Sequence, residues 1–297
     1  MADAAPIRVF DLAAVRRHRA RAAARGGADF LAIEAASRLA ERLDDTRRRF
    51  PRALDLGCGG GALAQAVAGR AGIAWLVSVD AALPFARAAV AEAESLPFAP
   101  ASFDLVLSAL ALHWVNDLPG ALLQLRHILR PDGLLLASLW GGETLKELRE
   151  ALIEAELEEE GGTSPRVSPM ADLGALGGLL QRAGFALPVV DADTIEVTYP
   201  DALALMRDLR AMGESNAVVE RRRAFTRRAT VARAGAIYTQ RFGGADGRIP
   251  ATFELVTLTA WAPDASQPRA LRPGSAAQRL ADALGGAEHS AGDKAAP

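Results

Sequence analysis

The chain has 297 residues and a net charge of −2. Its length suits one enlarged domain, or one domain and part of a second, and its 50% of apolar residues suffice for a large core. No apolar run approaches the ~18 residues of a membrane span, and no leader-like segment opens the chain, so we expect no membrane span. The balanced charge indicates no nucleic-acid partner. With four histidines and a single cysteine, Cys58, we expect no disulfide framework, no metal site and a reducing, cytoplasmic location, with an organellar matrix as the alternative.

An N-terminal helical extension is expected over residues 1–50. Phe30, Leu31, Ala35, Leu39 and Leu43 recur at three- and four-residue steps, which is typical of the buried face of a helix spanning 16–49. Residues 1–52 hold twelve Arg against seven acids, but they hold almost no Ser and show no cleavage-like break. A transit peptide is therefore not expected.

From residue 51 to 262 the pattern changes to short apolar runs separated by helical stretches. Strands are expected at 53–56, 75–79, 103–108 and 134–139, and helices at 62–68 and 119–129. Strands that are apolar on both sides and alternate with helices predict a mostly parallel sheet covered on both faces. The fold class is therefore a doubly wound α/β sheet.

Two helical insertions interrupt this sheet, at about 143–170 and 201–240. The first contains an acidic helix at 143–160 and precedes an apolar helix at 173–183. A strand at 195–199 comes next, then helices at 202–212 and 218–240, and the last strand at 253–261, so the second insertion precedes the last strand. The tail, 263–297, is rich in Ala, Gly, Pro and Ser and is expected to be disordered.

The strongest chemical signal is the glycine-rich loop 57–61 after the first strand. Its glycines let the main chain approach a ligand closely, and the following helix N-terminus offers free N–H donors. The sequence is neither a dinucleotide fingerprint nor a P-loop. Asp55, within the strand, indicates a cationic ligand group, which an aminoacyl moiety supplies. Asp80 ends the next strand, where a carboxylate can accept both hydroxyls of a ribose.

This arrangement resembles the class I S-adenosylmethionine-dependent methyltransferases, and the segments 92–98 and 102–106 are similar to later motifs of their "type 11" branch. The resemblance implies a Rossmann-like sheet and S-adenosylmethionine as the cofactor, with Glu92 and Ala93 at the adenine. The expected cofactor contacts are Asp55, Gly57, Cys58, Gly59, Gly61, Asp80, Ala81, Glu92, Ala93 and Ser108. One departure matters: the eleven residues between Asp80 and Glu92 predict a shortened second helix.

A narrower resemblance rests on the segments 112–119, 141–149, 164–169 and 212–216. They look like the complex I assembly-factor branch, whose mitochondrial member is held to hydroxylate an arginine of a complex I subunit, and the chain is also similar to the malonyl-carrier-protein methyltransferase of biotin synthesis. The resemblance implies a small-molecule or protein substrate, with a respiratory-complex subunit as one such partner. Three functions stay open: methyl transfer, arginine hydroxylation, and a non-catalytic assembly role.

Methyl transfer from a sulfonium needs mainly alignment of the acceptor. The Asn/Asp-Pro-Pro-aromatic motif of many amino-group methyltransferases is replaced here by the segment that begins at Ser108, which favours an oxygen acceptor or an undetermined one. His113 is the candidate general base, and a packed structural histidine is the alternative.

Three further features have two interpretations each. The bend 213–216 either faces the substrate or merely joins two helices. The arginines of 221–228 either meet an acidic partner or form a solvated face. Cys58 is either a reactive thiol or a small residue in a crowded loop.

Overall fold

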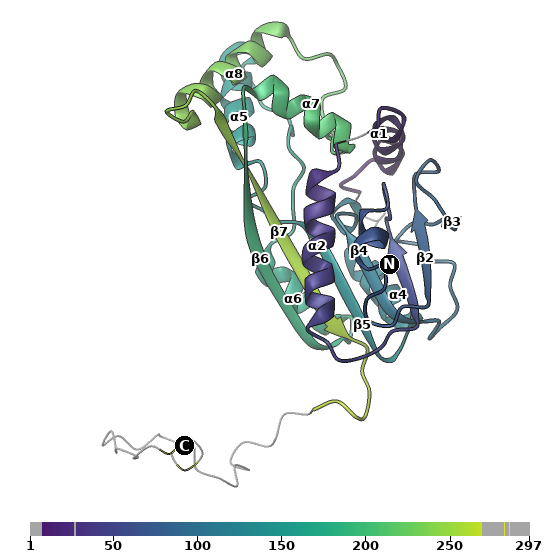
Figure 1. The fold of residues 1–297 in the computed structure, drawn as a ribbon. Helices are drawn as coiled ribbons and strands as arrows, with labels where there is room; N and C mark the ends of the chain where they lie inside the picture. The colour runs from purple at the N-terminus through teal and green to yellow at the C-terminus, as the bar shows by residue number, and fades with distance from the viewer. Residues whose placement is uncertain (1–7, 27, 269–281, 283–284, 286–297) are drawn as a thin grey trace, which may run out of the picture. The chain divides into compact units, whose positions relative to one another are not determined.

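The computed structural model describes residues 8–26, 28–268, 282 and 285. It contains one seven-stranded sheet with the order β3-β2-β1-β4-β5-β7-β6 (Figure 1). The first five strands of the chain pair in parallel, and β7 runs antiparallel to β5 and β6. The predicted doubly wound, mostly parallel sheet is confirmed. The strands are β1 (Arg52–Leu56), β2 (Trp75–Asp80), β3 (Ala89–Val90), β4 (Phe103–Ala109), β5 (Leu129–Trp140), β6 (Ala186–Tyr199) and β7 (Ile249–Trp261).

Helices cover both faces of the inner strands, and successive side chains of a strand point to opposite faces. In β4, Val106 belongs to the core that includes α4 and α6, whereas Leu105 and Leu107 belong to the core that includes α2 and α3. The helices are α1 (Leu12–Ala24), α2 (Phe30–Asp44), α3 (Ala62–Ala66), α4 (Leu118–Ile128), α5 (Lys146–Glu160), α6 (Leu173–Arg182), α7 (Ala202–Met212) and α8 (Arg228–Phe242), with a 3-10 turn η1 (Leu112–Trp114).

The described part of the N-terminal extension forms two helices, not one continuous helix. The predicted apolar stripe of α2 is buried at Leu31, Ala35, Leu39 and Leu43. Helix α1 ends before Gly26, whose φ of +75° suits a turn rather than a helix interior. Separated in this way from α2, helix α1 lies beside α7 (Figure 1).

The second insertion lies between β6 and β7, as predicted, and it packs on the extended ends of these two strands. Helices α5, α7 and α8 share one apolar cluster with Ile249, Ala251 and Phe253 of β7. The acidic α5 and the basic α8 lie against each other, and Arg233 pairs with Glu158 while Arg241 pairs with Glu150 and Glu154. The two oppositely charged blocks of the sequence therefore partly neutralise each other.

The largest differences from the sequence-based expectation concern three elements. The connection from Asp80 to Ala89 contains no helix at all, so the predicted crossover helix between β2 and β3 is absent rather than shortened. Helix α8 begins at Arg228, ten residues later than expected, and β6 begins at Ala186, because pairing with β7 extends it. The division of the chain at residues 50 and 262 stays a prediction, and most of the expected disordered tail lies outside the described residues. No described helix is long and apolar enough to cross a membrane.

The core under the insertion is expected to contribute strongly to stability. Leu205 of α7 is fully buried, whereas Leu203 on the same helix is 55% exposed. Replacing Leu205 by Ala leaves a cavity and is expected to lower the free energy of unfolding by about 2–5 kcal/mol, while Leu203→Ala should change it by less than about 0.5 kcal/mol. Urea denaturation followed by circular dichroism measures both, and equal effects would contradict the packing described here.

Candidate functional site

The candidate site lies at the carboxyl edge of the parallel strands. Strands β1 and β4 are neighbours in the sheet, and the chain leaves β1 toward β2 on one side and β4 toward β5 on the other. Such a reversal of strand order opens a crevice above the strand ends, where ligands of α/β sheets bind. The glycine-rich loop follows β1, Asp80 ends β2, and the segment 110–116 follows β4, so all three reach this crevice.

The glycine-rich loop is tightly folded against its neighbours. The N–H groups of Gly57 and Cys58 both donate to the carbonyl of Val79, at 2.8 and 3.0 Å. Gly57 has a φ of +78°, and a Cβ there would overlap the Cβ of Ala111. Helix α3 is only five residues long, so its dipole is small, and close backbone approach is the main property of the loop. Gly61 is the N-cap of this short helix.

Asp55 and Cys58 are both buried, and burial raises the pKa of each. Asp55 is inaccessible to solvent, and one of its oxygens accepts a hydrogen bond from the Ser78 hydroxyl at 3.3 Å, while its Oδ1 has no hydrogen-bond partner among the described residues. Burial raises the pKa of Asp55 to about 7. The Cys58 thiol donates to the carbonyl of Phe85, and burial raises its pKa to about 12. The thiol therefore stays protonated, which favours the small-residue interpretation.

Asp80 accepts three hydrogen bonds. Its Oδ1 accepts from the N–H of Ala82 at 2.8 Å, and its Oδ2 accepts from the N–H of Gly59 at 3.0 Å and from Nη2 of Arg19 at 2.6 Å. The Gly59 bond joins the two sequence motifs, since it ties the glycine-rich loop directly to the acid at the end of β2. Ser108 lies deeper, where its hydroxyl donates to the carbonyl of Leu56 and links β4 to β1.

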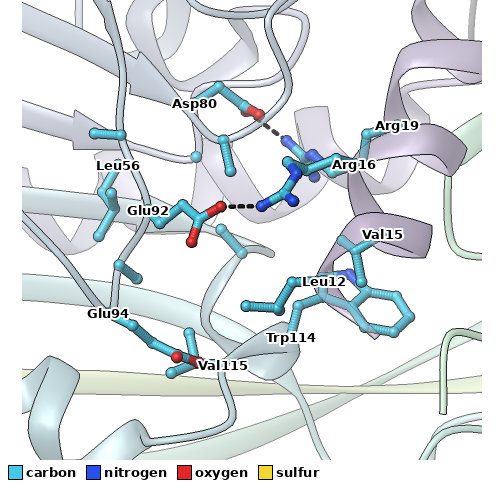
Figure 2. A pocket seen from close by; sticks show the side chains of 15 residues that line it. Leu12, Val15, Arg16, Arg19, Leu56, Asp80, Glu92, Glu94, Trp114 and Val115 are labelled. Atoms are coloured by element: carbon cyan, nitrogen blue, oxygen red, sulfur yellow. Dashed lines mark hydrogen bonds and ion pairs between the residues drawn. The ribbon is translucent and has the colours of Figure 1, made fainter. Parts of the chain in front are cut away.

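Three adjoining cavities follow the carboxyl edge. The Asp80 cavity, of about 580 Å³, contains the predicted Asp80, Ala81, Glu92 and Ala93. Although no crossover helix lies between β2 and β3, the short connection that replaces it brings Glu92 and Ala93 to the cavity wall. One further wall is the face of α1 that carries Arg16 and Arg19, which pair with Glu92 and Asp80 respectively, as Figure 2 shows.

The glycine-loop cavity, of about 1130 Å³, is lined by Asp55, Cys58 and Gly59. It adjoins the Asp80 cavity, because Gly57 and Arg19 line both. Neither Ser108 nor Gly61 is among the described residues that line these two cavities.

The insertion cavity, of about 1660 Å³, lies among α5, α7 and the bend 213–216. Its wall combines apolar side chains, such as Trp140, Leu148 and Phe253, with polar and charged ones, and Glu214 brings a carboxylate to it. Trp140 and Glu214 also line the glycine-loop cavity, so the bend stands between two cavities instead of simply joining two helices.

His113 lies behind Glu214, which lines both the glycine-loop and the insertion cavity. Its side chain is 1% exposed, and its Nε2 lies 3.2 Å from Oε2 of Glu214. Among the described residues, Nδ1 has no hydrogen-bond partner, and the ring packs beside Trp114 and Trp140. His113 is not among the residues that line the three cavities. The imidazole therefore reaches the cavities only through the Glu214 carboxylate.

Two residues of this site, Arg16 and Arg19, were missed by sequence reasoning. The only signal was the excess of arginine in the N-terminal segment, which does not distinguish a site residue from a solvated one. Among the described residues, no group of three His, Cys, Asp or Glu side chains lies close enough together to hold a metal ion.

Comparison with known proteins agrees with this geometry. Residues 54–137 match the family described as "Methyltransferase domain". The arginine-hydroxylase NDUFAF5, mitochondrial, of Danio rerio is 43% identical over 86% of this chain and 82% of its own length. The malonyl-[acyl-carrier protein] O-methyltransferase of Xylella fastidiosa is 38% identical over 86% of this chain and 89% of its own length. A Bacillus halodurans crystal structure, with a TM-score of 0.52 at 16% identity, covers 78% of this chain with all of its own and supports the fold.

These findings confirm the resemblance and correct one expectation. The methyltransferase domain supports S-adenosylmethionine as the cofactor, as predicted. The expected cytoplasmic location is wrong, because the relatives at 43–44% identity from fish, human, rat and mouse are mitochondrial proteins. Similarity over most of both chains decides the family: this chain belongs to the methyltransferase-fold family that includes the arginine-hydroxylase NDUFAF5 and the malonyl-[acyl-carrier protein] O-methyltransferases.

Proposed function

We propose that this protein is an S-adenosylmethionine-dependent methyltransferase. The observation that supports this most directly is the hydrogen bond from Gly59 to Asp80, because it brings the two parts of the cofactor motif together beside the Asp80 and glycine-loop cavities. When bound, S-adenosylmethionine supplies an activated methyl group. The insertion cavity, which adjoins the glycine-loop cavity, is the proposed acceptor site.

Each predicted contact has a role in this proposal. Asp80 accepts the ribose hydroxyls, and Asp55 holds the cationic amino group of the cofactor. Glu92 and Ala93 face the adenine. The remaining contacts shape the cleft: Ala81 lines the Asp80 cavity, Ser108 joins β4 to β1, and the loop residues Gly57, Cys58, Gly59 and Gly61 allow close approach of the backbone.

For the acceptor, we propose that Glu214 and His113 act as a pair. The Glu214 carboxylate lines both the glycine-loop and the insertion cavity, so it can orient an acceptor and receive its proton. His113 donates to it from Nε2 and holds it in place, since the orphaned Nδ1 suits a neutral ring with its proton on Nε2.

Arginine hydroxylation is the second candidate, because the relatives at 43–44% identity carry that name. A respiratory-complex subunit is then the proposed partner, and a small carrier-bound acid is the alternative substrate, as in the malonyl-[acyl-carrier protein] relatives.

Mass spectrometry separates the candidates. Release of S-adenosylhomocysteine with a methylated acceptor supports methyl transfer, an arginine that gains one oxygen selects hydroxylation, and cofactor binding with neither product favours a non-catalytic assembly role.

Replacing Asp80 tests the cofactor site. Asp80→Asn removes a charged acceptor, and hydrogen bonds to charged groups contribute about 1.5–3 kcal/mol, so the affinity for S-adenosylmethionine should fall by about tenfold or more. Titration calorimetry measures the affinity, and Asp246→Asn, on the exposed loop before β7, is the control. Equally tight binding by wild type and Asp80→Asn would overturn the assignment of the cofactor site.

The raised pKa of Asp55 predicts proton release on cofactor binding. Near pH 7 a large fraction of Asp55 is protonated in the free protein, because burial raises its pKa to about 7. A bound ammonium group favours the carboxylate, so binding should expel this proton, and the release should disappear well above pH 7, where Asp55 is already ionised. Calorimetry in two buffers of different ionisation enthalpy measures the release. The same release from Asp55→Asn would refute the role of Asp55.

His113→Ala should separate cofactor binding from turnover. Without the imidazole the Glu214 carboxylate loses its partner, so turnover of an acceptor that the wild type uses should fall by about a hundredfold or more, while the affinity for S-adenosylmethionine should stay within about twofold. His127→Ala, at the exposed end of α4, is the matched control. Loss of both properties, or of neither, would contradict the pairing.

A further inference from the structure

Arg19 is paired with Asp80, the carboxylate that the proposed cofactor needs as a hydrogen-bond acceptor. Its Nη2 lies 2.6 Å from Oδ2 of Asp80, and its guanidinium lies over the ring of Phe85, 5.4 Å from the centroid. The side chains of Arg19 and Asp80 are 13% and 1% exposed, so this is an ion pair inside the cleft and not a surface contact. Figure 2 shows Arg19 reaching Asp80 from helix α1, across the Asp80 cavity.

The other partners of Asp80 are fixed, and Arg19 is the movable one. Oδ1 is bonded to the N–H of Ala82 and Oδ2 to the N–H of Gly59, and both donors belong to the main chain of the site itself. A ribose that bonds through both hydroxyls needs an acceptor site on each oxygen, and Oδ2 already accepts two hydrogen bonds, so this ribose must displace the guanidinium of Arg19. Displacement leaves the Arg19 guanidinium unpaired in a largely enclosed place. An unpaired buried cation costs free energy unless another anion pairs with it.

The position of Arg19 indicates which anion replaces Asp80. Arg19 lines the glycine-loop cavity as well as the Asp80 cavity, and it shares the former with Asp55. If Asp55 holds the cofactor's ammonium, the carboxylate on the same carbon atom lies within a few ångströms of that point. A guanidinium is suited to a carboxylate because it offers parallel N–H donors.

We propose that Arg19 is a cofactor-binding residue that leaves Asp80 when S-adenosylmethionine enters and pairs with the carboxylate of its amino-acid part. The inference rests on the proposed function and adds to it a residue from outside the sheet. It also gives the site a means of recognition: the ribose and the amino acid are accepted together, because an adenosine without the amino acid displaces Arg19 and offers it nothing in return.

The exchange links the cofactor to the acceptor side. Close to Arg19, helix α1 approaches the end of α7 so tightly that a Cβ on Gly213 would lie 3.2 Å from the Arg19 Cα. His18 contacts the carbonyl of Ser215, in the bend that carries Glu214. Helix α1 therefore carries both the proposed cofactor residue and the contacts with the bend at the acceptor cavity.

Two adenosine ligands test the assignment by calorimetry. S-adenosylhomocysteine and methylthioadenosine share the adenosine and the thioether, and neither has a net charge, but only the first has the amino acid. Arg19→Gln should weaken S-adenosylhomocysteine binding by about tenfold to a hundredfold, while methylthioadenosine should bind equally well or more tightly because Asp80 is freed. Arg19→Lys, which keeps the charge but not the paired donors, should fall between wild type and Arg19→Gln for S-adenosylhomocysteine.

Arg17→Gln, on the exposed side of α1, is the matched control and should leave both affinities unchanged. Circular dichroism melting establishes that each variant is folded, and Arg19→Lys carries the test if Arg19→Gln does not fold. Equal weakening of both ligands, or no change for S-adenosylhomocysteine, would overturn the role of Arg19 while leaving the proposed function intact. A wild-type protein that binds neither S-adenosylmethionine nor S-adenosylhomocysteine would instead overturn the proposed function, and this inference with it.

Discussion

Two neighbouring carboxyl groups are buried at the carboxyl edge of the sheet, and burial of a carboxylate is costly unless its charge is removed or paired. Asp55 and Asp80 satisfy this constraint differently. Asp55 has few partners and a pKa raised to about 7, so protonation removes its charge. Asp80 accepts two main-chain N–H groups and the guanidinium of Arg19. Because that guanidinium comes from α1, the charge at the end of β2 ties the N-terminal helix to the sheet.

Helix α1 is consequently held from several sides. Arg19 and Arg16 reach the acids of the Asp80 cavity, and Asn116, which follows β4, accepts the N–H groups of Val9 and Phe10 just before the helix. The helix thus forms a wall of the Asp80 cavity and also contacts α7 of the insertion. A cofactor and an acceptor in adjoining cavities would share this wall, which is why the contacts of one site bear on the shape of the other.

Charge also arranges the insertion. The acidic α5 and the basic α8 are about 80 residues apart in the chain, and their side chains pair along the contact between the two helices. Individual exposed pairs of this kind contribute little. The apolar cluster beneath them, built on the extended ends of β6 and β7, is what holds the insertion in place.

Local periodicity and short motifs carry enough information to predict the sheet and the glycine-rich loop, and to propose Asp55 and Asp80 as site residues. The sequence also predicted that helices lie between the last two strands. Three features became visible only in the folded chain: the arginine-rich segment divides into α1 and α2, Arg19 meets Asp80, and His113 reaches the cavities only through Glu214. These pairs are separated by 61 and 101 residues, and no local pattern specifies which distant charge a side chain will meet when the chain folds. The net charge of −2 argued against a nucleic-acid partner, and the single cysteine against a disulfide framework. The role of an individual charge, in contrast, follows from its position in the fold.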